Sequence, residues 1–392
     1  MIDKIILIFL LIFTFILAFG VFDPVFGENS IFSLIELLAV IVTLGCFLGY
    51  FNIIIHRFSR NAIYLFLLLF SLFLSSVMYG YSENPKEIFN FKLLVCIVLY
   101  ISLAFIYKKN PRFVHYSLAS YSLGVIVFAI LLQTTYSNAI EMNKDRLVIF
   151  GENPNSTSAR LSIAVVFLFY FAIQNPFNIL FYRYISLILS LPIMLLVLQS
   201  GSRGSLVSMV IGCIAIIYFS NIKKTYKTIY TVLIVLAVPL VLTIVADTGS
   251  IQDRLTDSLV EGDLAGRDVL WLATLDIIYN NFIIGVGERG YLSEMQRLVG
   301  GYRDAHNLFL YLLASGGVVA FSFFMLFYKN LIIKSYYVFR KGDVLPLVLL
   351  INVTIIAVKT GGVLTYTMLW VVFAMISSYK PFEKNELKAM KI

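Results

Sequence analysis

Long apolar runs separated by short polar segments extend along most of the chain. A helix needs about 20 residues to cross the hydrocarbon core of a bilayer, and about twelve runs reach or approach that length. They lie near residues 5–22, 31–51, 62–80, 91–107, 113–133, 159–174, 180–199, 204–220, 228–246, 306–327, 345–358 and 362–379. We therefore expect an all-α integral membrane protein with about twelve transmembrane helices in one transmembrane domain, residues 1–392.

The composition agrees with this fold class and excludes an ordinary soluble protein. Hydrophobic residues make up 60% of the chain and charged residues only 13%. Soluble domains carry about 25% charged residues, because their surface must be hydrated. Most of the surface of this chain is therefore expected to face lipid.

The basic residues between the predicted spans indicate the orientation. The segments "HRFSR", "YKKNPR", "NIKKTYK", "YKNLIIKSYYVFRK" and "YKPFEKNELKAMK" all fall on the same side as Lys4. The positive-inside rule assigns that side to the cytoplasm, so both termini are expected there, and His56 and His115 in cytoplasmic loops. The opposite side carries short acidic loops, a loop near 134–158 and a long segment at 247–305, which we expect to be partly helical.

Arginine is concentrated on the non-cytoplasmic side, where basic residues are otherwise avoided. Of the 30 Lys and Arg residues, 18 fall on the inner side and five of these are Arg, whereas eight of the 12 outer ones are Arg. A guanidinium grips phosphate through two parallel hydrogen bonds, whereas an ammonium acts as a point charge. The pattern indicates a phosphorylated, membrane-held ligand. The outer arginines are Arg146, Arg160, Arg203, Arg254, Arg267, Arg289, Arg297 and Arg303.

Arg160, Arg203 and Arg267 stand out within this set because each lies at the boundary of an apolar segment. A charge close to the hydrocarbon is costly, so such residues usually mark a functional site. Local pairing with neighbouring aspartates is the simpler explanation for Arg254 and Arg303. The three boundary arginines are therefore our main candidates for ligand binding.

The long outer segment contains one predicted helix and a glycine-rich turn. In "RDVLWLATLDIIYNN" the apolar residues recur at helical spacing, which predicts a helix that lies against the membrane or the bundle. Arg267 and Asp268 open its first turn, where free amides favour an anion. "GVGERGY" predicts a turn and is too short for a dinucleotide-binding motif.

His306 is the one histidine expected on the outer side. Nearby positive charge lowers the pKa of an imidazole, so it stays neutral and can act as a general base. Asp304 and Glu288 are the competing base candidates. The outer side shows no His, Asp or Glu grouping typical of a metal site, so we expect neither a metal nor a cofactor.

Four segments, taken in order, resemble a known family. They are "GENPNSTSARL", "LQSGSRGSLVSMVIG", "GRDVLWLATLDIIYNNFIIGVG" and "AHNLFLYLLASGGVVAF", within residues 151–326. In this order they resemble the bacterial O-antigen polymerases and O-antigen ligases. The resemblance implies an integral-membrane glycosyltransferase of the GT-C type in the bacterial inner membrane, with its active site facing the periplasm.

The resemblance also implies roles for particular residues. Arg160, Arg203 and Arg267 would hold the pyrophosphate of an undecaprenyl-linked oligosaccharide, and His306 would activate the acceptor glycan. Tyr291, Tyr302 and Trp271 are candidates for stacking on sugar rings, or for interfacial anchoring. Membrane lipid and a chain-length regulator are further expected partners, and nucleic acid is not. The secondary site candidates are Asp304, Arg303, Arg289, Glu288, Asn307 and Asn155.

Three functions remain open from the sequence. A polymerase transfers the glycan to a second lipid-linked oligosaccharide, whereas a ligase transfers it to the lipid A core. Leu308 follows Asn307, where the ligases often carry an acidic residue, and this favours a polymerase. A flippase or other transporter is the third possibility, but transporters usually show internal repeats and ionisable residues near the midplane.

Overall fold

The computed structural model describes residues 2–20, 34–56, 60–79, 90–134, 140–143, 146–176, 180–225, 227–232, 267–301, 304–359 and 364–381. Most of these residues are helical. The helices are α1 (Ile2–Leu17), α2 (Leu34–His56), α3 (Arg60–Tyr79), α5 (Phe91–Lys109), α6 (Arg112–Thr134), α7 (Pro154–Gln174), α8 (Leu180–Gln199), α9 (Arg203–Phe219), α12 (Arg267–Asn280), α13 (Gly287–Val299), α14 (Leu308–Arg340), α15 (Leu345–Lys359) and α16 (Thr367–Ser378). Strands β1 (Ile140–Asn143) and β2 (Arg146–Ile149) pair antiparallel.

The helical character of the predicted membrane protein is confirmed for this part of the chain. Six of its helices are long and apolar enough to cross a membrane, namely α3, α5, α6, α7, α8 and α14. Shorter apolar helices, within α2 and in α9, α15 and α16, occupy four more of the predicted spans. The predicted span at 228–246 lies outside the described residues beyond residue 232, as does the outer segment up to residue 266. The count of twelve spans stays a prediction.

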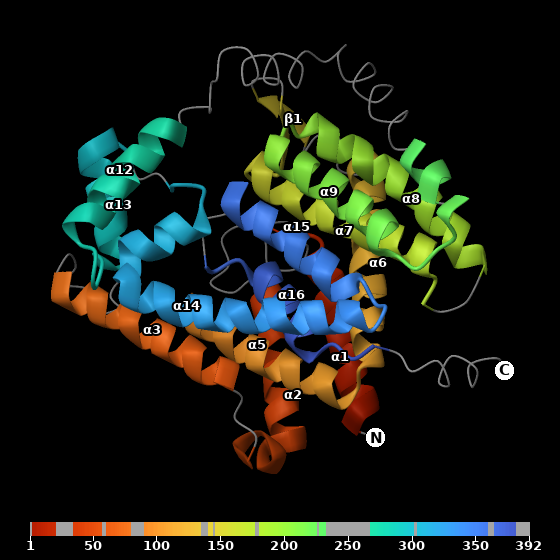
Figure 1. Ribbon diagram of the computed structural model, residues 1–392, viewed down its shortest axis with the longest axis horizontal. Helices are drawn as coiled ribbons and strands as arrows, with labels where there is room; N and C mark the ends of the chain where they lie inside the picture. Colours follow the sequence, from red (N-terminus) through yellow and green to blue (C-terminus); the bar gives the residue numbers. More distant parts are fainter. Residues whose placement is uncertain are drawn as a thin grey trace.

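The helices form a bundle with two distinct ends. Figure 1 shows α12 and α13 together at one end, beside α3 and α14, and the chain's N-terminus towards the other. At the N-terminal end, Lys109 in the last turn of α5 forms an ion pair of 3.1 Å with Asp3 in α1. At the α12–α13 end, Lys92 of α5 lies 3.6 Å from Glu36 of α2. We call the end that carries α12 and α13 the outer end.

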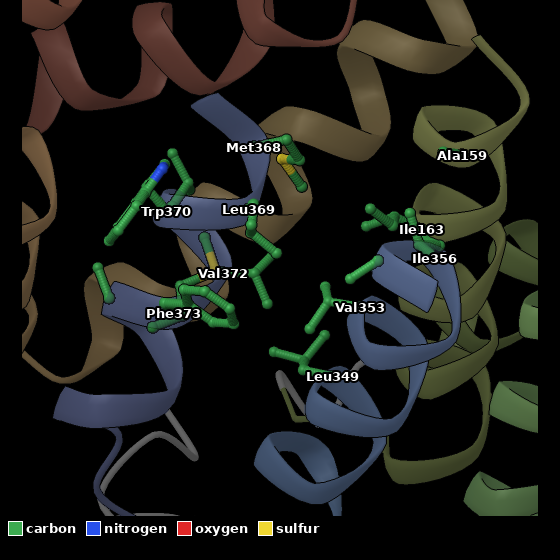
Figure 2. Packing of buried hydrophobic residues seen from close by; sticks show 14 of the residues in the cluster. Ala159, Ile163, Leu349, Val353, Ile356, Met368, Leu369, Trp370, Val372 and Phe373 are labelled. Carbon is green, nitrogen blue, oxygen red and sulfur yellow. The ribbon is translucent and has the colours of Figure 1, made fainter. Parts of the chain in front are cut away.

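The core lies where α16, α15 and α7 meet. Figure 2 shows the side chains of α16 facing those of α15, with side chains of α7 beyond them. Inside lipid, burial against another helix gains no hydrophobic free energy, so this core is stabilised by close van der Waals packing. This core fixes the helices that present the outer end. The labelled residues are Met368, Leu369, Trp370, Val372, Phe373, Leu349, Val353, Ile356, Ala159 and Ile163.

The outer segment at 134–158 differs from the predicted loop. It contains the β1–β2 hairpin, and α7 begins at Pro154, ahead of the predicted boundary at residue 159. The side chain of Asn153 accepts a hydrogen bond of 2.9 Å from the amide of Asn155, and proline follows at the first helical position. Arg160 therefore lies within α7 and not at its mouth.

Two expectations for the inner end are wrong. His115 is not in a loop: it lies in α6, is 1% exposed, and its Nε2 is 3.2 Å from Oη of Tyr379. Helix α6 begins directly after Pro111, and proline suits a helix start. The basic stretch "YKNLIIKSYYVFRK" is also helical as far as Arg340, because no helix breaker occurs before Gly342, which adopts φ +93°.

Helix α14 contains a break at Gly317. This residue has φ 61° and ψ −170°, and Figure 1 shows the first part of α14 at a steep angle to the remainder. The break leaves backbone amides and a carbonyl of α14 without partners inside the helix, and the loop between α12 and α13 forms hydrogen bonds with them. The amides of Val318 and Val319 donate to the carbonyls of Phe282 (2.9 Å) and Ile283 (3.3 Å), while Ala314 accepts from the amide of Val286 (3.0 Å).

Glycine is required on both sides of this contact. A Cβ added to Gly285, which has φ +75°, would lie 2.5 Å from the amide nitrogen of Gly317. A Cβ on Gly317 would lie 2.6 Å from the carbonyl carbon of Ile284. The turn predicted from "GVGERGY" is confirmed only at its first two residues, where Gly285 allows a close backbone approach to "SGG" in α14, because α13 begins at Gly287.

We predict that Gly285→Ala lowers the apparent melting temperature of the purified protein more than Gly300→Ala does. Both residues have positive φ, so each alanine adds strain of about 1–2 kcal/mol. Only the first substitution also brings a methyl group against α14, because a Cβ on Gly300 meets nothing within 4 Å. Equal shifts in thermal unfolding in detergent would contradict the tight contact between the loop and α14.

Candidate functional site

Arg203 is the first residue of α9, as its position before an apolar run predicted. Its side chain is half-buried. Ser202 precedes it as the N-cap but forms no capping bond through its side chain, and its Oγ instead lies 3.1 Å from Oγ of Ser205. The start of α9 therefore combines a guanidinium with amides that the serine side chain does not satisfy.

Arg267 is the first described residue of α12, which confirms that the predicted segment is helical. Burial lowers the pKa of Arg267, and the positive charge of Arg203 lowers it further. The starts of α9 and α12 thus bring two guanidinium groups into each other's electrostatic field. Two like charges held close together favour a bound anion, particularly at helix N-termini.

His306 lies two residues before α14, and the charges of Asp304 and Arg267 act on it. Burial lowers the pKa of its imidazole, Asp304 opposes this by raising it, and Arg267 lowers it again. The charge of Arg203 therefore acts on Arg267, and the charge of Arg267 acts on His306, although the three residues lie in separate segments of the chain. The pKa of His306 is lowered mainly by burial, and the expected effect of positive charge, from Arg267, is the smallest of the three causes.

Two residues of the segment "DAHN", Asp304 and Asn307, have structural roles. Asp304 Oδ1 accepts a hydrogen bond of 3.2 Å from the amide of His306, which has a left-handed backbone with φ +50°. Asn307 caps α14 by accepting from the amides of Phe309 (3.0 Å) and Leu310 (3.2 Å). Asn307 is thus committed to starting the helix, and Asp304 to supporting the backbone at His306.

Arg160 lies in a different environment from the other two boundary arginines. It is 3% exposed, and its guanidinium forms a two-point ion pair with Glu152, whose Oε2 accepts from Nη2 at 2.6 Å. Thr157 donates to the same carboxylate at 2.6 Å. A Cβ on Gly20 would collide with this guanidinium, so the end of α1 packs directly against it. The structure engages Arg160 with Glu152, and it groups Arg203 with Arg267.

Glu288 is held by two neighbouring helices. Tyr311 donates to one carboxylate oxygen at 2.7 Å, and Nδ2 of Asn90 donates to the other. Burial raises the pKa of Glu288, while these two hydrogen bonds lower it. Asn90 also caps α5 by accepting from the amide of Leu93 at 2.8 Å. Glu288 therefore anchors the start of α13 to α5 and α14.

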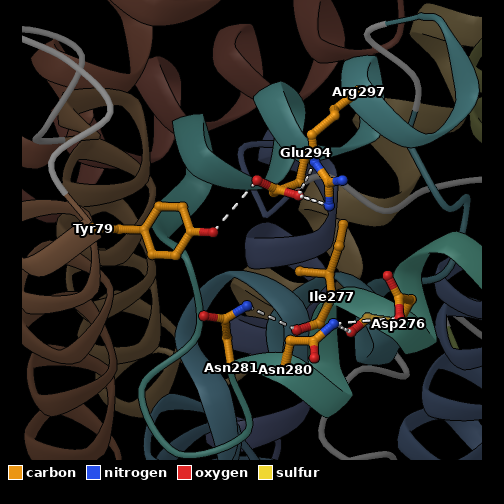
Figure 3. Close-up of polar contacts among 7 residues, drawn as sticks. All are labelled: Tyr79, Asp276, Ile277, Asn280, Asn281, Glu294 and Arg297. Carbon is orange, nitrogen blue, oxygen red and sulfur yellow. Dashed lines mark hydrogen bonds and ion pairs between the residues drawn. The ribbon is translucent and has the colours of Figure 1, made fainter.

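A second anchor holds the middle of α13. Figure 3 shows Glu294 between Tyr79 of α3 and Arg297 of its own helix. Tyr79 donates to Oε1 at 3.4 Å, and Arg297 donates to Oε2 at 2.6 and 2.9 Å. Arg289 is exposed on the same helix. Anchors at Glu288 and Glu294 keep α13 fixed against the bundle.

Lys359 is a cation near the site that the sequence did not single out. Its Nζ lies 5.7 Å from the ring centroid of Trp271, whose indole nitrogen donates to the carbonyl of Ala305 at 2.8 Å. Lys359 ends α15, so in the sequence it resembles an ordinary interfacial lysine. Only the packing of α15 near α12 brings it to the residues beside His306.

The aromatic candidates separate clearly. Tyr291 is 0% exposed, and its hydroxyl accepts from the amide of Ala305 at 2.9 Å, so it is not available to stack on a sugar. Trp271 is half-buried, whereas Tyr302 and Arg303 lie outside the described residues. Asn155 lies in the first turn of α7, beside its cap. Among the described residues, no three His, Cys, Asp or Glu side chains are grouped as metal ligands.

Comparison with known proteins supports the family inferred from the motifs. Residues 185–325 match the family model described as O-antigen ligase. This range includes Arg203, Arg267 and His306, and it supports a membrane glycosyltransferase of the O-antigen ligase/polymerase type. No curated protein matches the chain. No solved structure matches it.

We predict that Arg160→Gln reduces the yield and melting temperature of the folded protein, and that adding Glu152→Gln restores much of both. Removing one partner of a buried ion pair costs about 3–5 kcal/mol, because the remaining charge is left uncompensated. The double variant replaces both charges with amides that can bond to each other. A double variant no more stable than the single one would argue against this ion pair.

We predict that His306 titrates below the ordinary histidine pKa of about 6.5. Arg267→Gln should raise the midpoint, because a positive neighbour is lost, and Asp304→Asn should lower it, because a negative one is lost. The midpoint can be followed by NMR of histidine labelled with carbon-13, with the signal assigned from its absence in His306→Gln. If neither substitution changed the titration midpoint, the charges of Arg267 and Asp304 would not act on His306.

Proposed function

With residues 185–325 taken as those of an O-antigen ligase/polymerase-type enzyme, we propose that this chain polymerises a surface polysaccharide. It transfers a glycan from an undecaprenyl-pyrophosphate donor to the sugar of a second lipid-linked oligosaccharide. The observation that carries the proposal is the electrostatic grouping of Arg203, Arg267 and His306 at the starts of α9, α12 and α14.

Arg203 and Arg267 bind the donor pyrophosphate. The positive charge of Arg203 acts on Arg267, so a diphosphate bound near both would be attracted by two guanidinium groups. Each charge-assisted hydrogen bond from a guanidinium contributes about 1.5–3 kcal/mol. These bonds strengthen as the leaving pyrophosphate gains negative charge, so they favour the transition state over the bound donor.

His306 accepts the proton of the acceptor hydroxyl. The hydroxyl oxygen forms a bond to C1 of the donor sugar as the bond between C1 and the pyrophosphate oxygen breaks. The proton passes to the neutral imidazole, and the electron pair of the broken bond leaves with undecaprenyl pyrophosphate. Attack on the face opposite the leaving group inverts the configuration at C1. No metal is needed for this proton and charge balance.

A role of Arg160 in phosphate binding depends on its ion pair with Glu152. Its guanidinium is paired with Glu152, so it contributes to phosphate binding only if that pair opens. A folded Arg160→Gln/Glu152→Gln variant that still forms polymer would remove Arg160 from the phosphate-binding set. Asp304 is proposed to support the backbone of His306, and to replace it as base only if His306 proves dispensable.

The proposed location is the bacterial inner membrane, with the outer end of the bundle facing the periplasm and both termini in the cytoplasm. Support comes from the basic residues at the opposite end, where Lys108 and Lys109 end α5, Arg112 begins α6 and Lys341 follows α14. This orientation presents α12, α13 and the arginine pair to lipid-linked glycans in the periplasmic leaflet.

Ligation to the lipid A core is the second candidate. The matching family model is described as O-antigen ligase, which favours it, whereas Leu308 after Asn307 favours polymerisation. Both reactions use the same donor site, so the arginine pair and His306 serve either one. They differ only in the acceptor.

One reconstitution separates these functions. Purified protein in micelles is incubated with the lipid-linked oligosaccharide alone, and then with added core lipid. A ladder of products from the oligosaccharide alone is the expected result. Product that forms only with core lipid would indicate a ligase, and no product under either condition would favour transport over glycan transfer.

In this assay we predict that Arg203→Ala and Arg267→Ala slow product formation about tenfold to a hundredfold, as expected for one lost charge-assisted bond. Lysine at either position should rescue poorly, because it lacks the planar fork. Arg297→Ala is the matched control, since this outer arginine is exposed and paired with Glu294. A wild-type rate in both Arg203→Ala and Arg267→Ala would remove the pyrophosphate role.

A further inference from the structure

The peptide groups of Ala305 are held on both sides by side chains from two other helices. Its amide donates to Oη of Tyr291 in α13 at 2.9 Å, and its carbonyl accepts from Nε1 of Trp271 in α12 at 2.8 Å. Ala305 itself is fully buried. Two side-chain hydrogen bonds to one loop residue define its position more tightly than backbone conformation alone does.

The next residue has a backbone that a histidine rarely adopts. His306 lies in the left-handed region with φ +50°, which is unfavourable for a residue with a Cβ. Such a conformation persists only where the surroundings impose it. Here the constraint comes from Ala305 on one side and from the cap at Asn307 on the other, with Asp304 accepting from the amide of His306.

The same helix carries the arginine and one of the two holding side chains. Arg267 and Trp271 are four residues apart in α12, so they lie on the same face one turn apart. One helical turn and one hydrogen bond therefore connect the guanidinium of Arg267 to the backbone beside His306. This hydrogen bond holds the backbone of α12 at a defined position relative to the backbone beside His306.

We propose that Trp271 and Tyr291 are positioning residues that hold His306 in register with Arg267. The inference deepens the proposed function and rests on it, because it assigns these two residues to the geometry of the general base. Neither contacts the reacting atoms. They act through the backbone of Ala305.

Other roles for these aromatic side chains fit the contacts less well. The ring of Tyr291 packs edge-on against Tyr311, with centroids 5.1 Å apart, and its hydroxyl is also 3.5 Å from Oγ1 of Thr274. Burial raises its pKa to about 12, so it stays protonated and is not a base. Trp271 uses its N–H on Ala305 and lies beneath Lys359, which leaves the indole committed on two sides.

The test compares Tyr291→Phe and Trp271→Phe with two matched controls. Tyr107→Phe removes another fully buried hydroxyl, which donates to Ser117 at 3.1 Å. Trp370→Phe removes another indole N–H, which donates to the carbonyl of Leu364 at 2.6 Å. Both controls lie in the bundle and have no contact with Ala305 among those the structure describes.

We expect Tyr291→Phe and Trp271→Phe to lower kcat about tenfold to a hundredfold, as for a displaced catalytic group, with KM for the lipid-linked donor unchanged. The controls should keep the wild-type kcat per folded protein. Hydrogen exchange measured by mass spectrometry should quicken only in peptides that span Ala305. Should Trp271→Phe fail to fold, Tyr291→Phe decides the question.

The outcomes separate this inference from the proposed function. His306→Gln is assayed alongside, and we expect it to be inactive. If it is inactive while both aromatic variants match their controls in kcat, the positioning role is wrong and the proposed function stands. If His306→Gln turns over at the wild-type rate, the base role falls and the positioning role falls with it. A rise in KM with kcat unchanged would assign the two residues to donor binding instead.

Discussion

A chain in lipid must satisfy its own backbone hydrogen bonds. At the outer end of this bundle, the loop between α12 and α13 and the break in α14 satisfy each other's backbone groups. Helix α14 breaks at Gly317, and the loop at 282–286 supplies partners for the groups that the break exposes. The carbonyl of Ile284 also accepts from Ser75 of α3 at 2.5 Å. The contact needs glycine at 285 and 317, and it ties α12 and α13 to α14.

That tie explains why distant residues meet. Arg267 begins α12 and His306 lies just before α14, while the loop after α12 is bonded to the break in α14. The two helices therefore have one fixed register. Helix α13 adds a second attachment through Glu288 and Glu294, so the segment between α12 and α14 is held at several points. A site built on rigid elements keeps its geometry better than one on a free loop.

The charges at this end divide into two kinds. Arg160 is neutralised by Glu152 in a buried ion pair, which supports packing among α1, α6 and α7. Arg267 lies in the positive field of Arg203, which adds to the effect of burial in lowering the pKa of Arg267. Keeping two like charges close at the starts of two helices makes physical sense when an anion is part of the working state.

Much of the fold followed from hydropathy, since apolar runs at 62–80, 91–107 and 113–133 correspond to α3, α5 and α6. The start of α9 at Arg203 was also predictable, because this arginine stands before an apolar run, and the segment from Arg267 is helical as predicted. The family match at residues 185–325 supports the resemblance and includes three of the four motifs, but not "GENPNSTSARL".

Other features depend on contacts that the sequence does not display. Glu152 lies eight residues before Arg160, outside the helix, so helical spacing gives no sign of their pairing. The position of Lys359 over the ring of Trp271 depends on the packing of α15 near α12. The "NP" dipeptide at Asn153 and Pro154 was a readable signal for the start of α7, and using it would have placed Arg160 inside the helix.

Equilibrium binding of undecaprenyl pyrophosphate to the full-length protein in lipid nanodiscs tests the central claim most directly. If one diphosphate lies between two guanidinium groups, Arg203→Ala and Arg267→Ala each weaken binding about tenfold or more. The double variant then loses less binding free energy than the two single variants lose in sum. His306→Gln binds as the wild type does, because the base acts on the acceptor. Wild-type affinity in both arginine variants, or two strictly additive losses, would contradict a shared diphosphate site.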